Sequence, residues 1–231
     1  MRILFKTNYR QDLNLAKHSG HRFWYGLLIL ILFAAPMMLD GYYIGEATRV
    51  LIYAMAGLGL MVLTGFTGQA SLGHAAFLAI GAYTNAWFLA QGFSSFVALP
   101  MAALLSMIGG LLVAIPAARM SGIYLAIATL AFAIIVEDFA GHLTSITGGN
   151  RGMMVDVPML FGYQIRQSWE LYLFVLSVLV VATLAVLNIL RSPLGRAMIA
   201  VRDSEVSSQA LGVNPMKIKV FAFTVSAAIT G

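Results

Sequence analysis

Long apolar runs separated by short polar stretches dominate this chain. In the longest run, from Val50 to Ala118, no Asp, Glu, Lys or Arg occurs over sixty-nine consecutive positions. The hydrocarbon core of a bilayer is about 30 Å thick, and a helix needs roughly 20 residues to cross it. The run is therefore long enough for two or three membrane-spanning helices, and it predicts an integral membrane protein.

The whole pattern predicts an all-α, polytopic membrane protein with six spans and a shortened seventh. A polar loop at residues 40–49 separates the first two spans. The last apolar segment has fourteen residues, and at about 1.5 Å per residue it is too short to cross, so we expect further spans beyond it. The predicted spans are Phe23–Leu39, Val50–Phe66, Leu72–Ala90, Phe96–Ala118, Gly122–Val136, Leu171–Leu190 and the shortened Ile218–Gly231.

Basic residues predict the orientation. A cytoplasmic basic arm, residues 1–22, precedes a transmembrane domain, residues 23–231. If each segment crosses once, the arm, Arg119 and residues 191–219 share one side, which then holds eleven of the fourteen Lys and Arg residues. The positive-inside rule makes that side cytoplasmic, so we expect the N-terminus to lie inside the cell. A re-entrant hairpin or a half-helix at residues 72–90 is an alternative that would invert everything after it.

Composition narrows the class further. Hydrophobic residues make up 60% of the chain and charged residues 10%, and the mean hydropathy is +0.87, which argues against a soluble domain. The chain has a net charge of +5, and its basic residues lie beside apolar segments. This arrangement indicates contact with a lipid bilayer and not with nucleic acid. The absence of cysteine excludes disulfides and thiolate metal sites. The first apolar segment lacks an Ala-x-Ala cleavage signal, which favours a retained span over a signal peptide.

A glycine-rich polar segment, residues 65–74, interrupts the longest apolar run. Backbone without regular helix is tolerated at membrane depth only inside protein or along a water-filled path. We therefore predict a broken helix whose free amides and carbonyls contact a passing substrate. Close helix packing is the alternative, since small residues also recur at four-residue spacing within 110–118 and 122–126. The candidate substrate-pathway residues are Gly65, Thr67, Gly68, Gln69, Ser71, Gly73 and His74.

His74 is the only ionisable side chain in that run, apart from tyrosine. An ionisable residue inside a membrane often has a functional role. A neutral histidine hydrogen-bonded to a backbone carbonyl is an equally economical explanation. We favour the structural interpretation and keep His74 among the pathway candidates.

Two short helices are predicted in a cytoplasmic loop, residues 191–217. Ser192 is suited to an N-cap and Pro193 to the first helical position. Apolar residues at positions 194, 197, 198 and 201 then form one stripe. Asp203 or Ser204 would cap the second helix, and the glycine at 212 suits a left-handed stop.

This loop has two interpretations. A helix lying on anionic lipid would explain its arginines, whereas acidic residues at positions 203 and 205 favour docking to a cytosolic partner. In the second interpretation, reversing both acidic charges should release that partner. The candidate coupling residues are Leu194, Gly195, Arg196, Met198, Arg202, Asp203, Glu205, Ala210 and Gly212.

Four sequence blocks resemble permease subunits of branched-chain amino acid ABC importers, of the LivM type. They follow the family's order and span most of the chain. The blocks are residues 64–77 (TGFTGQASLGHAAF), 121–130 (SGIYLAIATL), 147–152 (TGGNRG) and 192–214, which opens with SPLGRA and ends with ALGVN. The resemblance implies alternating-access transport of Leu, Ile or Val, with residues 195–212 pressed against ATPase subunits.

The same resemblance implies a set of partners. These are a second, LivH-like permease subunit, two cytosolic ATPase subunits and a periplasmic or extracellular amino-acid-binding protein. The chain has no Gly-x-x-x-x-Gly-Lys-Ser/Thr loop, so ATP and Mg²⁺ would bind to the partner subunits and this chain would hold no cofactor.

Other functions stay open at this point. Related importers carry urea, amides or other amino acids. A secondary carrier driven by ions is another possibility, although the acidic residues lie at the edges of spans and not within them. An enzyme is disfavoured because no nucleophile–base pair, carboxylate pair or metal-binding cluster stands out.

Overall fold

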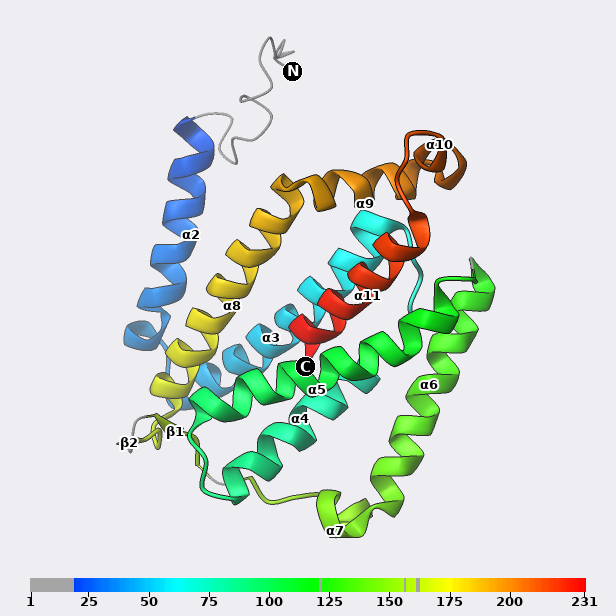
Figure 1. The fold of residues 1–231 in the computed structure, drawn as a ribbon. Coiled ribbons are helices and arrows are strands. Elements are labelled where there is room, and N and C mark those ends of the chain that lie inside the picture. Colours follow the sequence, from blue (N-terminus) through cyan, green and yellow to red (C-terminus); the bar gives the residue numbers. More distant parts are fainter. Residues whose placement is uncertain (1–18, 121, 156, 161–162) are drawn as a thin grey trace.

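The structure, a computed structural model, describes residues 19–120, 122–155, 157–160 and 163–231, which form a bundle of helices (Figure 1). In chain order the helices are α2 (Ser19–Met38), α3 (Gly41–Leu60), the π-helical turn η1 (Met61–Gly65), α4 (His74–Ala90), α5 (Ser95–Ala117), α6 (Ile123–His142), α7 (Thr144–Thr147), the 3-10 turn η2 (Gly149–Arg151), α8 (Ser168–Arg191), α9 (Pro193–Asp203), α10 (Glu205–Ala210) and α11 (Pro215–Thr230).

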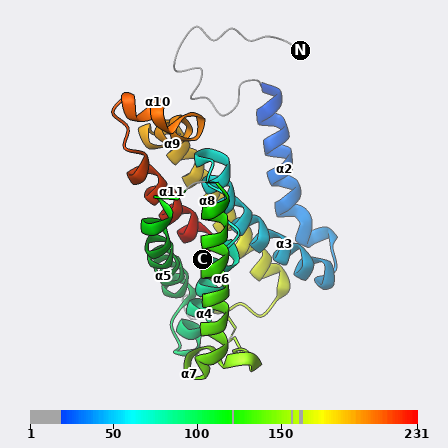
Figure 2. The ribbon, with the colours of Figure 1, turned by 90° about the vertical axis from the view of Figure 1, so that its right-hand side faces the viewer.

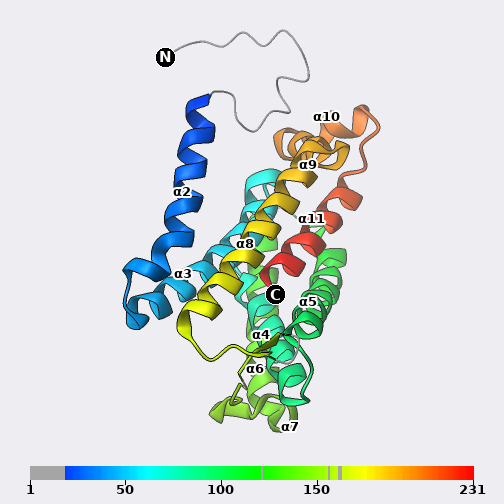
Figure 3. The same cartoon turned by 90° about the vertical axis from the view of Figure 1, so that its left-hand side faces the viewer.

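The helices reverse direction along the chain. In Figure 1, α2, α4, α6 and α11 run one way, and α3, α5 and α8 run the other way. Figures 2 and 3 show α9 and α10 at one end of the bundle, α7 at the opposite end, and α2 to one side. Residues 66–73 and α4 continue toward the α7 end without turning back, so the re-entrant alternative does not describe this segment. Most of the predicted basic arm, residues 1–18, lies outside the described residues.

Within the described residues, four helices are long and apolar enough to cross a membrane. They confirm a helical membrane protein, whereas the count of six spans and a seventh stays a prediction. Phe23–Met38 is a shorter apolar helix, and α4 and α11 have only 17 and 16 residues. The four long helices are Gly41–Gly65, Ser95–Ala117, Ile123–His142 and Ser168–Arg191.

The predicted polar loop at residues 40–49 is wrong, because α3 already begins at Gly41. Ile44, Thr48 and Leu51 are buried at helical spacing and form the inner face of this first part of α3. An exposed ion pair joins Glu46 to Arg49 at 3.0 Å, away from this inner face. A few charges on an exposed helical face therefore resembled a loop in the sequence.

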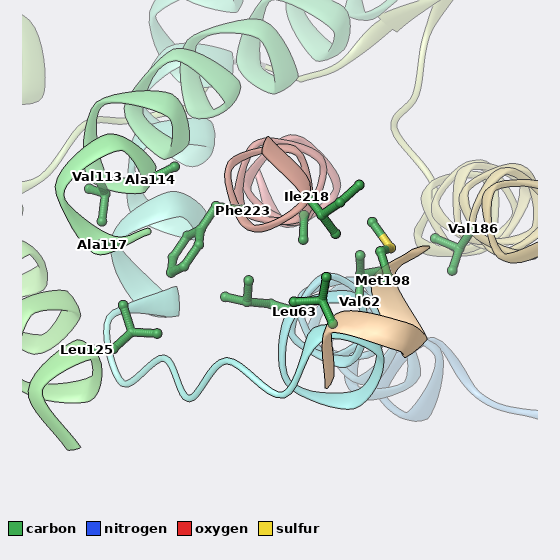
Figure 4. Packing of buried hydrophobic residues seen from close by; sticks show 12 residues of the cluster. Val62, Leu63, Val113, Ala114, Ala117, Leu125, Val186, Met198, Ile218 and Phe223 are labelled. Atoms are coloured by element: carbon green, nitrogen blue, oxygen red, sulfur yellow. The ribbon is translucent and has the colours of Figure 1, made fainter. Parts of the chain in front are cut away.

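The main hydrophobic core lies where η1, α5, α9 and α11 meet (Figure 4). Leu63, Met198 and Phe223 are completely buried there. A second cluster joins α3 to α8, and the hydroxyl of Tyr172 in that cluster donates to the carbonyl of Leu32 in α2 at 3.0 Å. The main core consists of Val62, Leu63, Val113, Ala114, Ala117, Leu125, Val186, Met198, Val201, Ile218, Ala222 and Phe223.

A small β-hairpin at the α7 end was not predicted. Strands β1 (Met159–Leu160) and β2 (Tyr163–Gln164) pair antiparallel, with Met159 opposite Gln164. The hydroxyl of Ser94 donates to the carbonyl of Met159 at 3.0 Å and ties the hairpin to the start of α5. Strands of two residues are too short for an alternating pattern to reveal them.

Candidate substrate pathway and coupling elements

The glycine-rich segment, residues 65–74, joins α3 to α4 and confirms the predicted break. The α3 helix first widens into the π-helical turn η1, which ends at Gly65. After one more helical turn the chain is irregular from Gly68 to Gly73, and α4 begins at His74. Short π-helical turns occur frequently at functional sites in helices.

Side chains in the middle of this segment alternate between the protein interior and the surface. Thr67, Gln69 and Ser71 are buried, while the intervening residues 68, 70 and 72 are exposed. The Thr67 hydroxyl donates to the Leu63 carbonyl at 2.5 Å and accepts from the side-chain Nε2 of Gln69 at 3.2 Å. Most polar groups of the segment are thus engaged within the chain, and the exposed side consists of backbone and apolar side chains.

The buried side chain of Gln69 is an exception. Its Oε1 atom is buried and has no hydrogen-bond partner among the described residues. A buried acceptor without a partner is costly in a folded protein. Gln69 is therefore the pathway candidate with unused hydrogen-bonding capacity.

His74 links three helices through hydroxyl groups. Its Nε2 lies 2.9 Å from the hydroxyl of Ser226 in α11, and that hydroxyl donates to the carbonyl of Gly59 in α3 at 2.5 Å. Since a serine hydroxyl has one hydrogen, Nε2 must be the donor to Ser226. Nδ1 faces the Ser71 hydroxyl at 3.4 Å. The partners are serine hydroxyls, whereas we expected a backbone carbonyl.

The end of the segment packs tightly against α6. The amide of Leu72 donates to the hydroxyl of Thr129 at 3.0 Å. A Cβ atom on Gly73 would overlap the backbone carbonyl of Thr129, so only glycine allows this approach. Thr129 was not among the residues selected from the sequence. The one feature that could have indicated its role is a polar hydroxyl group within a long apolar run.

Helix capping in the loop at residues 191–217 follows the prediction. Ser192 caps α9 by accepting from the Gly195 amide at 3.4 Å, and Pro193 is the first helical residue. Of the two predicted caps for α10, Ser204 is the one used, accepting from the Ser207 amide at 3.2 Å. The glycine at position 212 has φ +83°, as a left-handed stop requires.

The predicted apolar stripe of α9 is only partly right. Met198 and Val201 are buried in the main core, but Leu194 is 43% exposed. Gly195 is buried instead. It packs so closely against α8 that a Cβ at this position would collide with the backbone of Leu190. The sharp turn between α8 and α9 rotates the start of α9, which periodicity alone does not reveal.

Both acidic residues of the loop form ion pairs within the chain. Asp203 pairs with Arg202 at 3.0 Å, and Glu205 pairs with Lys219 of α11 at 2.6 Å. The Lys219 side chain is only 6% exposed. Reversing both acidic charges would therefore disturb the folding of the loop itself, and it is not a clean test of docking. The candidates Arg196 and Ala210 are exposed.

The Glu205–Lys219 pair leads to a stability prediction. Glu205→Gln should lower the melting temperature of the full-length permease complex by a few degrees, because a buried ammonium then lacks its counter-charge. The double variant Glu205→Gln with Lys219→Met should recover most of that loss, since it removes the buried charge as well. Equal melting temperatures for the wild type and Glu205→Gln would contradict the importance of this pair.

The structure brings the candidate coupling residues into contact with the candidate substrate-pathway residues. Arg202 Nη1, at the end of α9, donates to the carbonyl of Gly65 at 2.9 Å. These residues are 137 positions apart in the sequence, which explains why local pattern did not connect them. The loop at residues 191–217 thus contacts the glycine-rich segment directly.

A cavity of about 420 Å³ lies between α4 and α6 and begins one residue beyond His74. Its ionisable lining residues are Tyr83 and Glu137, and most of the rest are alanine or glycine. This cavity was not predicted from the sequence. The lining residues are Ala75, Ala76, Ala79, Tyr83, Ala133, Val136, Glu137, Ala140, Gly141, Gly149 and Gly152.

Comparison with known proteins identifies the family. Residues 42–231 match the family described as "Branched-chain amino acid transport system / permease component". The high-affinity branched-chain amino acid transport system permease proteins LivM of Salmonella typhimurium and Escherichia coli are 37% and 36% identical over 229 residues. Each alignment covers 88% of this chain and 54% of the relative.

A more distant relative is the probable branched-chain amino acid transport permease protein LivM of Methanocaldococcus jannaschii, 26% identical over 58% of this chain and 39% of its own length. The chain spans about half the length of the first two relatives. No solved structure matches it. The extent of the family match and of the two closer alignments shows that this chain belongs to the permease components of branched-chain amino acid transport systems.

Proposed function

We propose that the chain is part of a membrane-spanning permease subunit in an ATP-driven importer of Leu, Ile or Val. The observation that carries this proposal is the family match over residues 42–231, together with 37% identity to a LivM permease. In this proposal, a binding protein outside the cell delivers the amino acid, and the permease alternates between outward-open and inward-open states.

The partners follow from the same proposal. A LivH-like permease completes the path, and two cytosolic ATPase subunits bind ATP and Mg²⁺. The ATPases dock at the α9–α10 end, which would face the cytoplasm of a bacterium with the N-terminus inside the inner membrane. Support comes from two apolar side chains that are exposed by 78% and 81%: Val206 in α10 and Leu211 directly after it, at an end of the bundle (Figure 1).

The substrate path in this proposal follows the glycine-rich segment. Its support is the exposed backbone at residues 68 and 70, where the chain leaves the helix, because carbonyl and amide dipoles outside a helix suit the charged ends of an amino acid. The cavity between α4 and α6 adjoins the same segment and has a small, mainly apolar lining that suits an aliphatic side chain. Each of the six predicted spans would cross once.

Uptake of labelled leucine tests the proposed function. Cells with and without the full-length gene are compared, with ATP depleted in one arm and the proton gradient collapsed in another. We expect gene-dependent uptake that is lost with ATP and survives the ionophore. Loss with the ionophore while ATP remains would favour a secondary carrier. Uptake of labelled urea, but not of leucine, would assign a different substrate.

A further inference from the structure

The end of α9 and the start of the glycine-rich segment form one contact. Arg202 donates from Nη1 to the Gly65 carbonyl at 2.9 Å, at the last residue of the π-helical turn. The other edge of its guanidinium donates from Nε and Nη2 to Oδ1 of Asp203, at 3.1 and 3.0 Å. Asp203 therefore orients the guanidinium toward Gly65, and charge-assisted bonds of this kind are the stronger hydrogen bonds in proteins.

The aliphatic stem of Arg202 lies against Gly68. A Cβ atom at Gly68 would lie 3.0 Å from Cγ of Arg202 and 3.8 Å from its Cα. Gly68 also has φ +68°, a conformation that residues with side chains rarely adopt. The start of the irregular segment therefore packs directly against the side chain of Arg202.

The surrounding apolar contacts join the same two elements. Met198 and Val201 of α9 lie in one core cluster with Val62 and Leu63 of the α3–η1 helix (Figure 4 labels all of these but Val201). Non-directional apolar packing holds α9 against this helix, which leads into the irregular chain beyond Gly65. The Arg202 bond acts at the point where that chain departs. At the other end of the segment, Gly73 is held against Thr129.

We propose that Arg202 is a positioning residue that transmits movement of α9 to the glycine-rich segment. This inference rests on the proposed function, in which ATPase subunits move α9. When α9 shifts, the guanidinium pulls on the Gly65 carbonyl and its stem displaces Gly68, so the segment rearranges while α6 holds its far end. Arg202 then serves the coupling of ATP hydrolysis to transport, and not the docking of the ATPase.

The test uses the full-length permease complex with Arg202→Met, which keeps most of the aliphatic stem and removes every hydrogen bond of the guanidinium. Arg202→Lys keeps the charge but not the fork that reaches two acceptors. The matched control is Arg49→Met, because Arg49 is an exposed arginine outside both candidate groups and its Nη1 forms a 3.0 Å ion pair with Glu46 within α3.

We expect normal ATPase co-purification and ATP hydrolysis in Arg202→Met, with leucine transported per ATP reduced at least tenfold. Arg202→Lys should fall between Arg202→Met and the wild type, and Arg49→Met should match the wild type. Unchanged leucine transport per ATP in Arg202→Met would overturn the inference. Loss of the ATPase from Arg202→Met would also overturn it and would make Arg202 a docking residue.

A second readout does not depend on transport. A single cysteine replaces the exposed Ala70 in an otherwise cysteine-free complex, and its alkylation rate is compared with and without ATP and vanadate. We expect a nucleotide-dependent change that Arg202→Met abolishes, at an unchanged melting temperature. A nucleotide-dependent change that persists in Arg202→Met would overturn the proposed role of Arg202 and leave the proposed function standing. A wild type with neither ATP-dependent uptake nor a nucleotide response would overturn the proposed function, and the role of Arg202 with it.

Discussion

Val206→Asp and Leu211→Asp should each weaken association with the ATPase subunits at least tenfold. The two side chains are 78% and 81% exposed, so neither substitution removes packing within this chain, and surface changes of this kind rarely alter stability by more than about 0.5 kcal/mol. An aspartate in the first turn also suits the N-terminus of α10. In the proposed complex, however, burial of each side chain would contribute about 1.5–3 kcal/mol, and about 1.4 kcal/mol corresponds to a factor of ten.

The measurement is the amount of ATPase that co-purifies with tagged full-length permease from detergent-solubilised membranes. Met154→Asp is the matched control, because Met154 is 96% exposed and lies in the chain between η2 and β1, away from α10. We expect the control to retain the ATPases and the double variant Val206→Asp with Leu211→Asp to lose them. Full retention by the double variant would show that α10 is not the docking surface.

Gly73→Ala should markedly destabilise the full-length permease. The new methyl group would overlap the backbone carbonyl of Thr129, which belongs to a long helix and cannot turn aside as a flexible side chain could. Overpacking costs about 1–3 kcal/mol and occasionally more, and a backbone neighbour places this site at the upper end. We expect a clear fall in the melting temperature and in the monodisperse yield of the full-length complex.

Gly57→Ala provides the control for this substitution. Gly57 lies on an exposed face of α3 and has nothing within 4 Å of an added Cβ, so alanine should leave stability unchanged or raise it by about 0.5–1 kcal/mol. Thr129→Val offers a milder test of the same contact, since it removes the acceptor of the Leu72 amide at a cost of about 1–3 kcal/mol. Equal melting temperatures for Gly73→Ala and Gly57→Ala would contradict this packing.

Much of the local structure was predictable because its causes are local. The caps at Ser192 and Ser204 depend on residues only three positions away. The break after Gly65 follows from a cluster of glycine and polar residues within an apolar run. The start of a helix that carries charged residues was harder to predict, as α3 shows. An exposed helical face and a loop both contain polar and charged residues, so composition does not distinguish them.

The candidate site was less predictable, since the roles of its polar residues depend on distant partners. Thr67 and Ser71 were expected to face a substrate, but within this chain they are buried and hydrogen-bonded. Glu205 was expected at a docking surface and pairs with Lys219. No periodicity in the sequence contains such information, because each of these side chains could equally well have pointed to solvent.

The sequence by itself determined the membrane class, the approximate helices, the broken segment and the resemblance to branched-chain amino acid permeases. These depend on hydrophobicity, capping and short motifs, which act over a few neighbouring residues. Only the tertiary structure decided that His74 joins Ser226, that Gly73 rests on Thr129 and that Arg202 reaches Gly65. Each of these contacts joins residues far apart in the sequence, and it exists only after the helices have packed against one another.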